Sequence, residues 1–135
     1  MSAQKRHVEV AIALVWRDGR VLVTRRPDNV HLAGLWEFPG GKLGPGETAE
    51  ACAERELYEE VDVVARARSR RASIEWEYAE RHVTLHPVNC EWVRGDGSAR
   101  EVSELRWALP EELGELEFPA ANASLLRTLS EGRGG

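Results

Sequence analysis

The chain has 135 residues, of which 42% are hydrophobic and 30% charged, a length and balance typical of one soluble globular domain. Its formal net charge of −5 argues against binding a nucleic-acid polymer, which needs clustered positive charge. No apolar run approaches the roughly 20 residues of a membrane-spanning helix, and Cys52 and Cys90 lack metal-ligand spacing, so we expect a reduced cytoplasmic protein without a membrane partner.

The pattern of apolar and β-branched residues predicts a chain of strands with a central and a terminal helix. Strands are predicted at residues 8–16, 20–24, 35–38, about 63–78, 82–94 and 105–108. Turns are predicted at residues 18–19, 79–80 and 95–97, and loops at residues 27–34 and 39–46. Helices are predicted from Thr48, as N-cap, to about Val61, from Pro110, and over residues 119–130.

This order of elements predicts an α/β fold in which a mixed sheet packs against helices. We expect a single domain over residues 1–130 and a disordered tail at residues 131–135. One basic run stands out, Arg66, Arg68, Arg70 and Arg71. We interpret it as a solvated strand edge in preference to a phosphate site.

The central helix carries the most informative residues. At 100° per residue, Glu56, Glu59 and Glu60 project within about a 100° arc of the helix, and like charges at these spacings repel one another. A hard divalent cation such as Mg²⁺ offsets such repulsion and bridges to substrate phosphates. An acid-rich surface helix is the alternative reading. A glycine-rich loop before the helix, and Arg55 within reach of the acids, favour the metal site.

These residues resemble the Nudix box, G-x5-E-x7-R-E-U-x-E-E-x-G-U, where U is a bulky aliphatic residue. The matching positions are Gly41, Glu47, Arg55, Glu56, Leu57, Glu59, Glu60 and Val63. Asp62 stands where the box has its last glycine, at the helix C-terminus. Since Asp tolerates the left-handed conformation better than most residues, we expect a small stability cost and unchanged chemistry.

The resemblance extends over about residues 8 to 129 and is to the bacterial MutT-type Nudix hydrolases. Further similar stretches are residues 21–26, 36–42, 81–85 and 118–122. The resemblance implies an α/β/α sandwich with a mixed sheet. It also implies Mg²⁺- or Mn²⁺-dependent hydrolysis of nucleoside triphosphates to monophosphate and pyrophosphate, with 8-oxo-dGTP as the substrate of MutT-type members.

The resemblance also implies roles for individual residues. Metal ligands would be the carbonyl of Gly40 and the carboxylates of Glu56, Glu59 and Glu60. Gly41, Glu47 and Arg55 would shape and position this site. Glu101 matches a distal acid that ligates a metal or accepts a proton in the family, although the sequence barely distinguishes it from Glu104.

Substrate contacts are implied at Arg26, beside the phosphates, and at His31 and Arg81, beside the nucleotide. Asn122 is the candidate for base selection, because an amide offers a donor and an acceptor together; helix capping is its alternative role. Tyr78 and Phe118 are candidates for the base pocket, with core packing as the alternative.

Several functions remain open at this stage. Hydrolysis of oxidised purine triphosphates is preferred, because Asn122 favours a purine reader. A CTP, dCTP or modified-pyrimidine pyrophosphohydrolase is the main alternative, followed by ADP-ribose or dinucleoside polyphosphate hydrolysis, and then by a nucleotide sensor without turnover. Either a monomer or a homodimer fits the sequence.

Overall fold

Two long strands, β1 (Arg6–Arg17) and β7 (Arg81–Arg94), form the centre of the fold and pair in parallel, from Arg6 opposite Arg81 to Trp16 opposite Glu91. The protein is seen here in a computed structural model that describes residues 5–29 and 32–132. The shorter strands are β2 (Arg20–Arg25), β3 (Trp36–Glu37), β4 (Gly40–Lys42), β5 (Val64–Arg70), β6 (Ile74–Glu77) and β8 (Glu104–Ala108).

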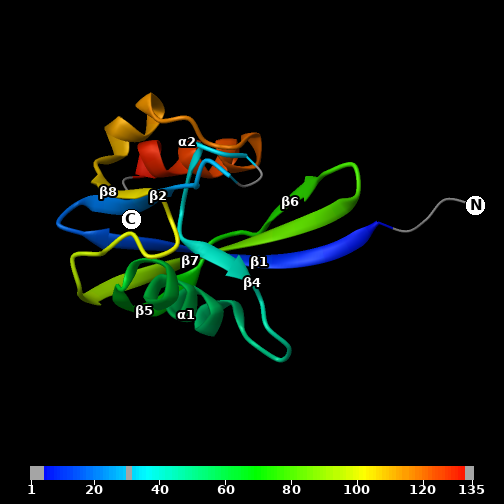
Figure 1. The fold of residues 1–135 in the computed structure, drawn as a ribbon, viewed down its shortest axis with the longest axis horizontal. Helices are drawn as coiled ribbons and strands as arrows, with labels where there is room; N and C mark the ends of the chain where they lie inside the picture. The colour runs from blue at the N-terminus through cyan, green and yellow to red at the C-terminus, as the bar shows by residue number, and fades with distance from the viewer. Residues whose placement is uncertain (1–4, 30–31, 133–135) are drawn as a thin grey trace, which may run out of the picture.

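The eight strands found in the described residues belong to one mixed sheet. Its main order is β3-β2-β1-β7-β5, with β4 paired to β1, β6 to β7 and β8 to β2. Helix α1 (Ala49–Val61) covers one face, and α2 (Ala123–Gly132) covers the other (Figure 1). Two 3-10 helices, η1 (Pro110–Glu115) and η2 (Ala120–Asn122), lie on the α2 side. The predicted α/β sandwich with a mixed sheet is therefore confirmed.

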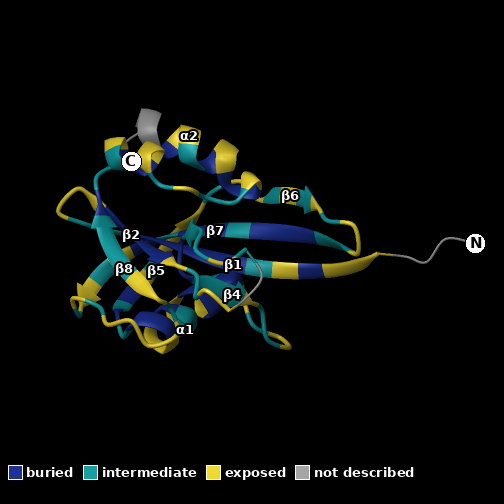
Figure 2. Ribbon diagram, turned by 45° about the horizontal axis from the view of Figure 1, so that its top comes forward, coloured by how far each residue is buried: buried dark blue, intermediate teal, exposed yellow. Residues whose placement is uncertain are grey.

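Alternation along β1 builds a core on each side of the sheet. Ala11, Ala13 and Val15 are fully buried under α1, whereas Ile12 and Leu14 pack in the second core with residues of α2. Successive strand residues point to opposite faces, so an uninterrupted apolar run is what a strand covered on both sides requires. Figure 2 shows the consequence, because β1 is buried in its middle and exposed toward its N-terminal end.

The predicted strand at residues 63–78 is wrong in one respect, because it is divided into β5 and β6. The last β5 pair joins Arg70 to Val88, and the first β6 pair joins Ile74 to Leu85. Between these pairs lies Pro87, which has no N–H to donate to a neighbouring strand. Its carbonyl accepts a hydrogen bond from the Arg71 N–H at 2.9 Å, and β5 ends there.

The prediction of a loop throughout residues 39–46 is also wrong, because residues 40–42 form β4. This strand pairs antiparallel with β1, placing Gly40 opposite Ile12. A Cβ on Gly40 would lie 2.1 Å from the carbonyl oxygen of Ala11, so only glycine permits this approach. Proximity of two backbones is not encoded in a local pattern of residues.

The helix at Pro110 and the last helix also differ from the predictions. The helix that Pro110 opens is a 3-10 helix, and the last helix begins with the 3-10 turn η2 before α2 starts at Ala123. Helix α2 continues through Gly132, two residues into the predicted tail, whose last three residues lie outside the described chain. Among the described residues, no helix is long and apolar enough to span a membrane.

Ion pairs support the interpretation of the basic run as a strand edge. Arg68 lies 3.1 Å from Glu91, and Arg70 lies 2.8 Å from Glu50 of α1. Arg71 donates a hydrogen bond to Asn89 at 3.2 Å. These arginines therefore have protein partners along β5 and just beyond it.

Candidate active site

Helix α1 starts as the sequence predicts, directly after the glycine-rich segment. Thr48 has extended backbone angles, and its side chain accepts a hydrogen bond from the Ala51 N–H at 3.1 Å, as an N-cap does. The helix packs closely against β4 at Glu56, because a Cβ on Gly41 would lie 2.6 Å from the carboxyl group of Glu56. Gly41 thus leaves the space in which this carboxyl group sits.

Arg55 joins the acids of α1 to the segment before it. Its Nε and Nη2 donate to the two oxygens of Glu47, at 2.8 and 2.9 Å. Its Nη1 donates to Glu56 at 3.1 Å and to Glu59 at 3.0 Å. Hydrogen bonds from Arg55 and the Gly44 N–H lower the pKa of Glu47 to about 2, and Glu47 in turn raises the pKa of Arg55. The structure thus links Arg55 to three acids, and the positioning role of Glu47 and Arg55 stays a prediction.

Glu60 is the most buried of the three helix glutamates, with 8% of its surface exposed. The Gly40 N–H donates to its Oε2 at 3.0 Å. Burial, a hydrogen bond that protonated Glu60 donates to Glu56, and repulsion by the charge of Glu56 raise the pKa of Glu60 to about 9. By contrast, the side chain of Glu59 is 48% exposed. Because of its raised pKa, Glu60 keeps its proton at neutral pH when no metal is bound, and ionisation of both acids requires a positive charge beside them.

The carboxylate oxygens of Glu56, Glu59 and Glu60 are suitable ligands for a hard divalent cation. The buried Glu60 and the half-buried Glu56 lie next to the backbone of Gly40 and Gly41, and oxygen donors are what Mg²⁺ prefers. Their oxygens do not all converge, because Arg55 draws Glu56 and Glu59 toward itself. Within the described residues, the one group whose metal-binding atoms lie within 4.8 Å of one another is His7, Glu75 and His82, a different cluster.

Glu101 lies next to α1, on the loop that follows β7. Its N–H and that of Arg100 both donate to the carbonyl oxygen of Glu60, at 3.2 and 3.1 Å. Glu104, which the sequence could not separate from it, instead forms an ion pair with Arg25 at 3.1 Å. The loop therefore brings the backbone of Glu101 beside Glu60, and its side chain is exposed.

A cavity of about 250 Å³ opens on the α2 side of the sheet. Of the predicted substrate residues, Arg26, Tyr78, Arg81 and Asn122 line it. Its floor is apolar and is formed by the even-numbered residues of β1 and the odd-numbered residues of β7, Val8, Val10, Ile12, Val83 and Leu85. The cavity extends to Gly40 and Gly41, the two residues against which Glu60 and Glu56 pack.

Asn122 is buried in the cavity wall, with 7% of its surface exposed. Its N–H donates to the Pro119 carbonyl, whereas no hydrogen bond joins its side-chain amide to a described residue. Helix capping, the alternative role, is therefore not what the amide does here. Nearby, the guanidinium of Arg81 lies 5.2 Å from the centre of the Tyr78 ring, so these two side chains form one wall.

Glu37 is a cavity residue that the sequence analysis missed. It pairs with Arg26 at 3.2 Å, and burial raises its pKa while Arg26 opposes the rise. Its charge also contributes to raising the pKa of Glu60, so it belongs to the same electrostatic cluster. Glu37 lies in segment 36–42, one of the stretches that resemble the MutT-type proteins, and this was the signal that could have identified it. Its place in a short predicted strand gave no reason to choose it as a site residue.

One of the predicted substrate residues that the structure describes, Phe118, does not enter the cavity. Its ring instead packs against Phe38, with ring centres 5.4 Å apart, in the core beneath α2. The alternative role of core packing applies to Phe118, because Phe38 is almost fully buried and offers an apolar surface. His31 lies outside the described residues.

Comparisons with known proteins agree with this geometry. Residues 10–128 match the family described as NUDIX domain. CTP pyrophosphohydrolase from Escherichia coli strain K12 is 37% identical over 118 residues, which are 87% of this chain and 86% of the relative. The 8-oxo-dGTP diphosphatase of the same strain is 32% identical over 123 residues, 90% of this chain and 95% of the relative. The crystal structure of the MutT protein from Methanosarcina mazei superposes with a TM-score of 0.86 at 26% identity, covering 97% of this chain and 98% of the other.

Proposed function

This chain belongs to the Nudix family and is a hydrolase of phosphoanhydride bonds; from this premise we propose that it hydrolyses oxidised purine nucleoside triphosphates such as 8-oxo-dGTP to monophosphate and pyrophosphate. One observation carries the proposal. The cavity that Asn122 lines continues to Gly40 and Gly41, where the carboxyl groups of Glu60 and Glu56 lie. A base held by Asn122 would direct its phosphates toward these acids.

The phosphates need positive charge in a net-negative protein. Mg²⁺ or Mn²⁺, held by Glu56, Glu59, Glu60 and the Gly40 carbonyl, would neutralise them and make bound water a better nucleophile. Arg26, in the cavity wall beside Glu37, is the side chain placed to contact the phosphate chain. Arg55 keeps the acids oriented, and Glu101, beside the backbone of Glu60, is the candidate to accept a proton from water.

The base would lie between the apolar sheet floor and the residues of the cavity rim. Val8 and Val83 offer a flat apolar surface to one side of a ring, and Tyr78 with Arg81 forms a wall. The side-chain amide of Asn122 supplies a donor and an acceptor, which together can read a purine edge. A ligand that pairs with both groups would bind better than one that leaves either of them unpaired.

CTP or a modified pyrimidine triphosphate is the second candidate substrate. The observation in its favour is the relative named CTP pyrophosphohydrolase, which is 37% identical to this chain. Both candidates use the same acids and release the same pyrophosphate, so the choice depends on the cavity alone. We place the reaction in the cytoplasm, where nucleoside triphosphates are made and used, and expect a monomer or homodimer without a nucleic-acid partner.

A specificity assay decides between the two substrates. We would measure kcat/KM with Mg²⁺ for 8-oxo-dGTP, dGTP, CTP, 5-substituted dCTP, ADP-ribose and diadenosine tetraphosphate. We expect 8-oxo-dGTP to be preferred, and Asn122→Ala to reduce its advantage over dGTP by about tenfold or more, the effect of losing hydrogen bonds to a base edge. Phe118→Leu, outside the cavity, is the control and should leave the ratio unchanged. A preference for CTP in the wild-type protein would overturn the purine assignment.

A further inference from the structure

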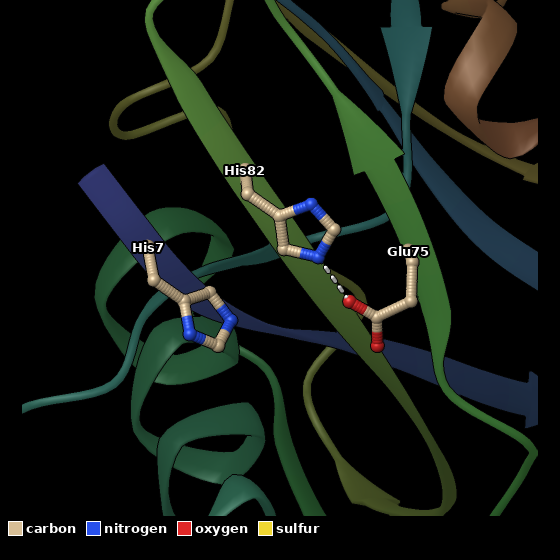
Figure 3. A group of neighbouring side chains, drawn as sticks. All are labelled: His7, Glu75 and His82. Atoms are coloured by element: carbon tan, nitrogen blue, oxygen red, sulfur yellow. Dashed lines mark hydrogen bonds and ion pairs between the residues drawn. The ribbon is translucent and has the colours of Figure 1, made fainter. Parts of the chain in front are cut away.

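A second cluster of metal-binding side chains lies on the face of the sheet opposite the cavity. His7 comes from β1, Glu75 from β6 and His82 from β7 (Figure 3). One metal-binding atom of each residue lies within 4.8 Å of those of the other two. The sheet register explains why the three side chains lie close together. The pairing of β1 with β7 places His7 directly opposite His82, and the pairing of β6 with β7 places Glu75 opposite Thr84.

Alternation of side chains separates this cluster from the cavity. Val8 and Val83, the next residues along β1 and β7, point into the cavity, so His7 and His82 point to the α1 side. Both strands extend beyond α1 at this end of the molecule (Figure 1), which leaves the cluster partly exposed. Neither the proposed base pocket nor the helix glutamates use these side chains.

Hydrogen bonds within the cluster arrange its ligand atoms. Nδ1 of His82 contacts Glu77, and Nε2 lies 2.5 Å from Oε1 of Glu75. The Thr84 hydroxyl donates to the same Glu75 oxygen at 2.8 Å and lies 2.8 Å from Nε2 of His7. A carboxylate behind one imidazole nitrogen fixes the tautomer that leaves the other nitrogen free to bind a metal. Glu77 is in that position for His82.

The charge of the cluster favours a cation. The cluster includes the carboxyl group of Glu75 and, beside it, that of Glu77, and carboxylate oxygens attract a cation. Glu77 is offset by Lys5, whose Nζ lies 2.5 Å from it, whereas among the described residues the groups that can offer Glu75 a positive charge are the imidazoles of His82 and His7.

We propose that His7, Glu75 and His82 form a binding site for a transition-metal divalent cation, with Zn²⁺ as the best fit. Two imidazole nitrogens and one carboxylate oxygen form a three-ligand set that zinc accepts, with water in the fourth position. Mg²⁺ prefers an all-oxygen set, so this cluster differs in selectivity from the helix glutamates. A bound metal would connect β1, β6 and β7 at one point.

Calorimetric titration of ZnCl₂ into the full chain, with millimolar Mg²⁺ present to occupy the helix glutamates, tests the site. We expect one equivalent of zinc to bind to the wild-type protein, and His7→Gln and Glu75→Gln each to weaken that affinity by about tenfold or more. His86→Gln is the matched control, because His86 lies on the same face of β7 and pairs with Glu9 at 2.9 Å. It should bind zinc with wild-type affinity.

Histidine side-chain ¹⁵N spectra provide a second readout that does not depend on activity. Zinc should shift the ring nitrogens of His7 and His82 and leave those of His86 in place. Circular dichroism of the metal-free variants checks that each is folded, and the exposed His7 is the position at which substitution disturbs the sheet least. Zinc binding with equal affinity in His7→Gln, Glu75→Gln and wild type would overturn the proposal, as would the absence of a one-equivalent site.

Discussion

At Glu60, the requirements of metal binding and of fold stability conflict, because a metal ligand must be ionised whereas burial favours the protonated form. It is buried beside Glu56 and receives a hydrogen bond from the Gly40 N–H. Its pKa is raised from an ordinary value of 4.5 to about 9, so the folded protein holds this proton more tightly than the unfolded chain does. Stability from Glu60 is therefore complete below the unfolded pKa and is lost as pH rises toward the folded value.

The pH dependence of stability of metal-free protein tests this assignment. In the presence of a chelator, the contribution of Glu60 lowers Tm as pH rises from 5 to about 9, the span between the unfolded and folded pKa values. In Glu60→Gln this contribution is absent, so the difference in Tm between variant and wild type should grow with pH. Saturating Mg²⁺ should narrow the difference by stabilising the ionised carboxylate. Parallel Tm curves for the two proteins would contradict the raised pKa.

At the level of single residues, the structure brings together many of the residues that the sequence singled out, and the differences have physical causes. Arg55 and Glu47 are eight residues apart but carry complementary charges at a helix start, so their pairing could be expected. Glu37 and Phe118 could not be assigned in the same way. Whether a side chain enters a cavity or the core depends on the twist and packing of strands that are distant in sequence.

At the scale of elements, the C-terminal end of α1 departs from the Nudix box and yet keeps its geometry. Asp62 has φ 58° and ψ 41°, the left-handed conformation that glycine usually provides. Its carboxylate pairs with Arg100 at 3.2 Å. The loop of Arg100 also satisfies helix carbonyls, because Ser98 donates to Val61 at 2.8 Å. The helix end stays intact because Asp tolerates the left-handed backbone conformation and because its carboxylate pairs with Arg100.

Substitutions of Asp62 test the cap. Asp62→Val places a β-branched residue at positive φ and should lower the free energy of unfolding by about 1–2 kcal/mol. Asp62→Gly removes the conformational strain, but it also removes the ion pair with Arg100 and increases the conformational entropy of the unfolded chain. Because these effects oppose one another, we expect the free energy of unfolding to change by only a few tenths of a kcal/mol. Urea unfolding of both variants measures these values. Equal destabilisation by Val and Gly would show that the conformation at this position is unimportant.

The order and type of the main elements were predictable because strand alternation and the Thr48 cap are local signals. The division of β5 from β6 was less so, because it depends on Pro87 lying opposite residues 71–73 across the sheet. Strand β4 was missed for a related reason. Its glycines signalled an unusual backbone, but the close approach of Gly40 to Ala11 is a tertiary contact.

At the scale of the whole molecule, one sheet separates two kinds of chemistry. Its α2 side bears the apolar cavity, the edge at β4 connects that cavity to the acids of α1, and the α1 side bears the His7, Glu75 and His82 cluster. The parallel pairing of β1 with β7 lines up residues of both strands along each face. Functions on the two faces can therefore be altered independently, by substitutions one residue apart.

Metal-dependent release of pyrophosphate is the most direct test of the account, because it joins the cavity to the helix glutamates. With 8-oxo-dGTP and Mg²⁺, the wild-type protein should release monophosphate and pyrophosphate in equal amounts, and a chelator should stop the reaction. Glu59→Gln, at a half-exposed position, should keep the fold and lower kcat by about a hundredfold or more. Glu54→Gln is the control and should retain activity, because Glu54 lies on the same helix but accepts a hydrogen bond from the Ala67 N–H of β5. Turnover without metal, release of orthophosphate alone, or a near wild-type rate for Glu59→Gln would contradict the account.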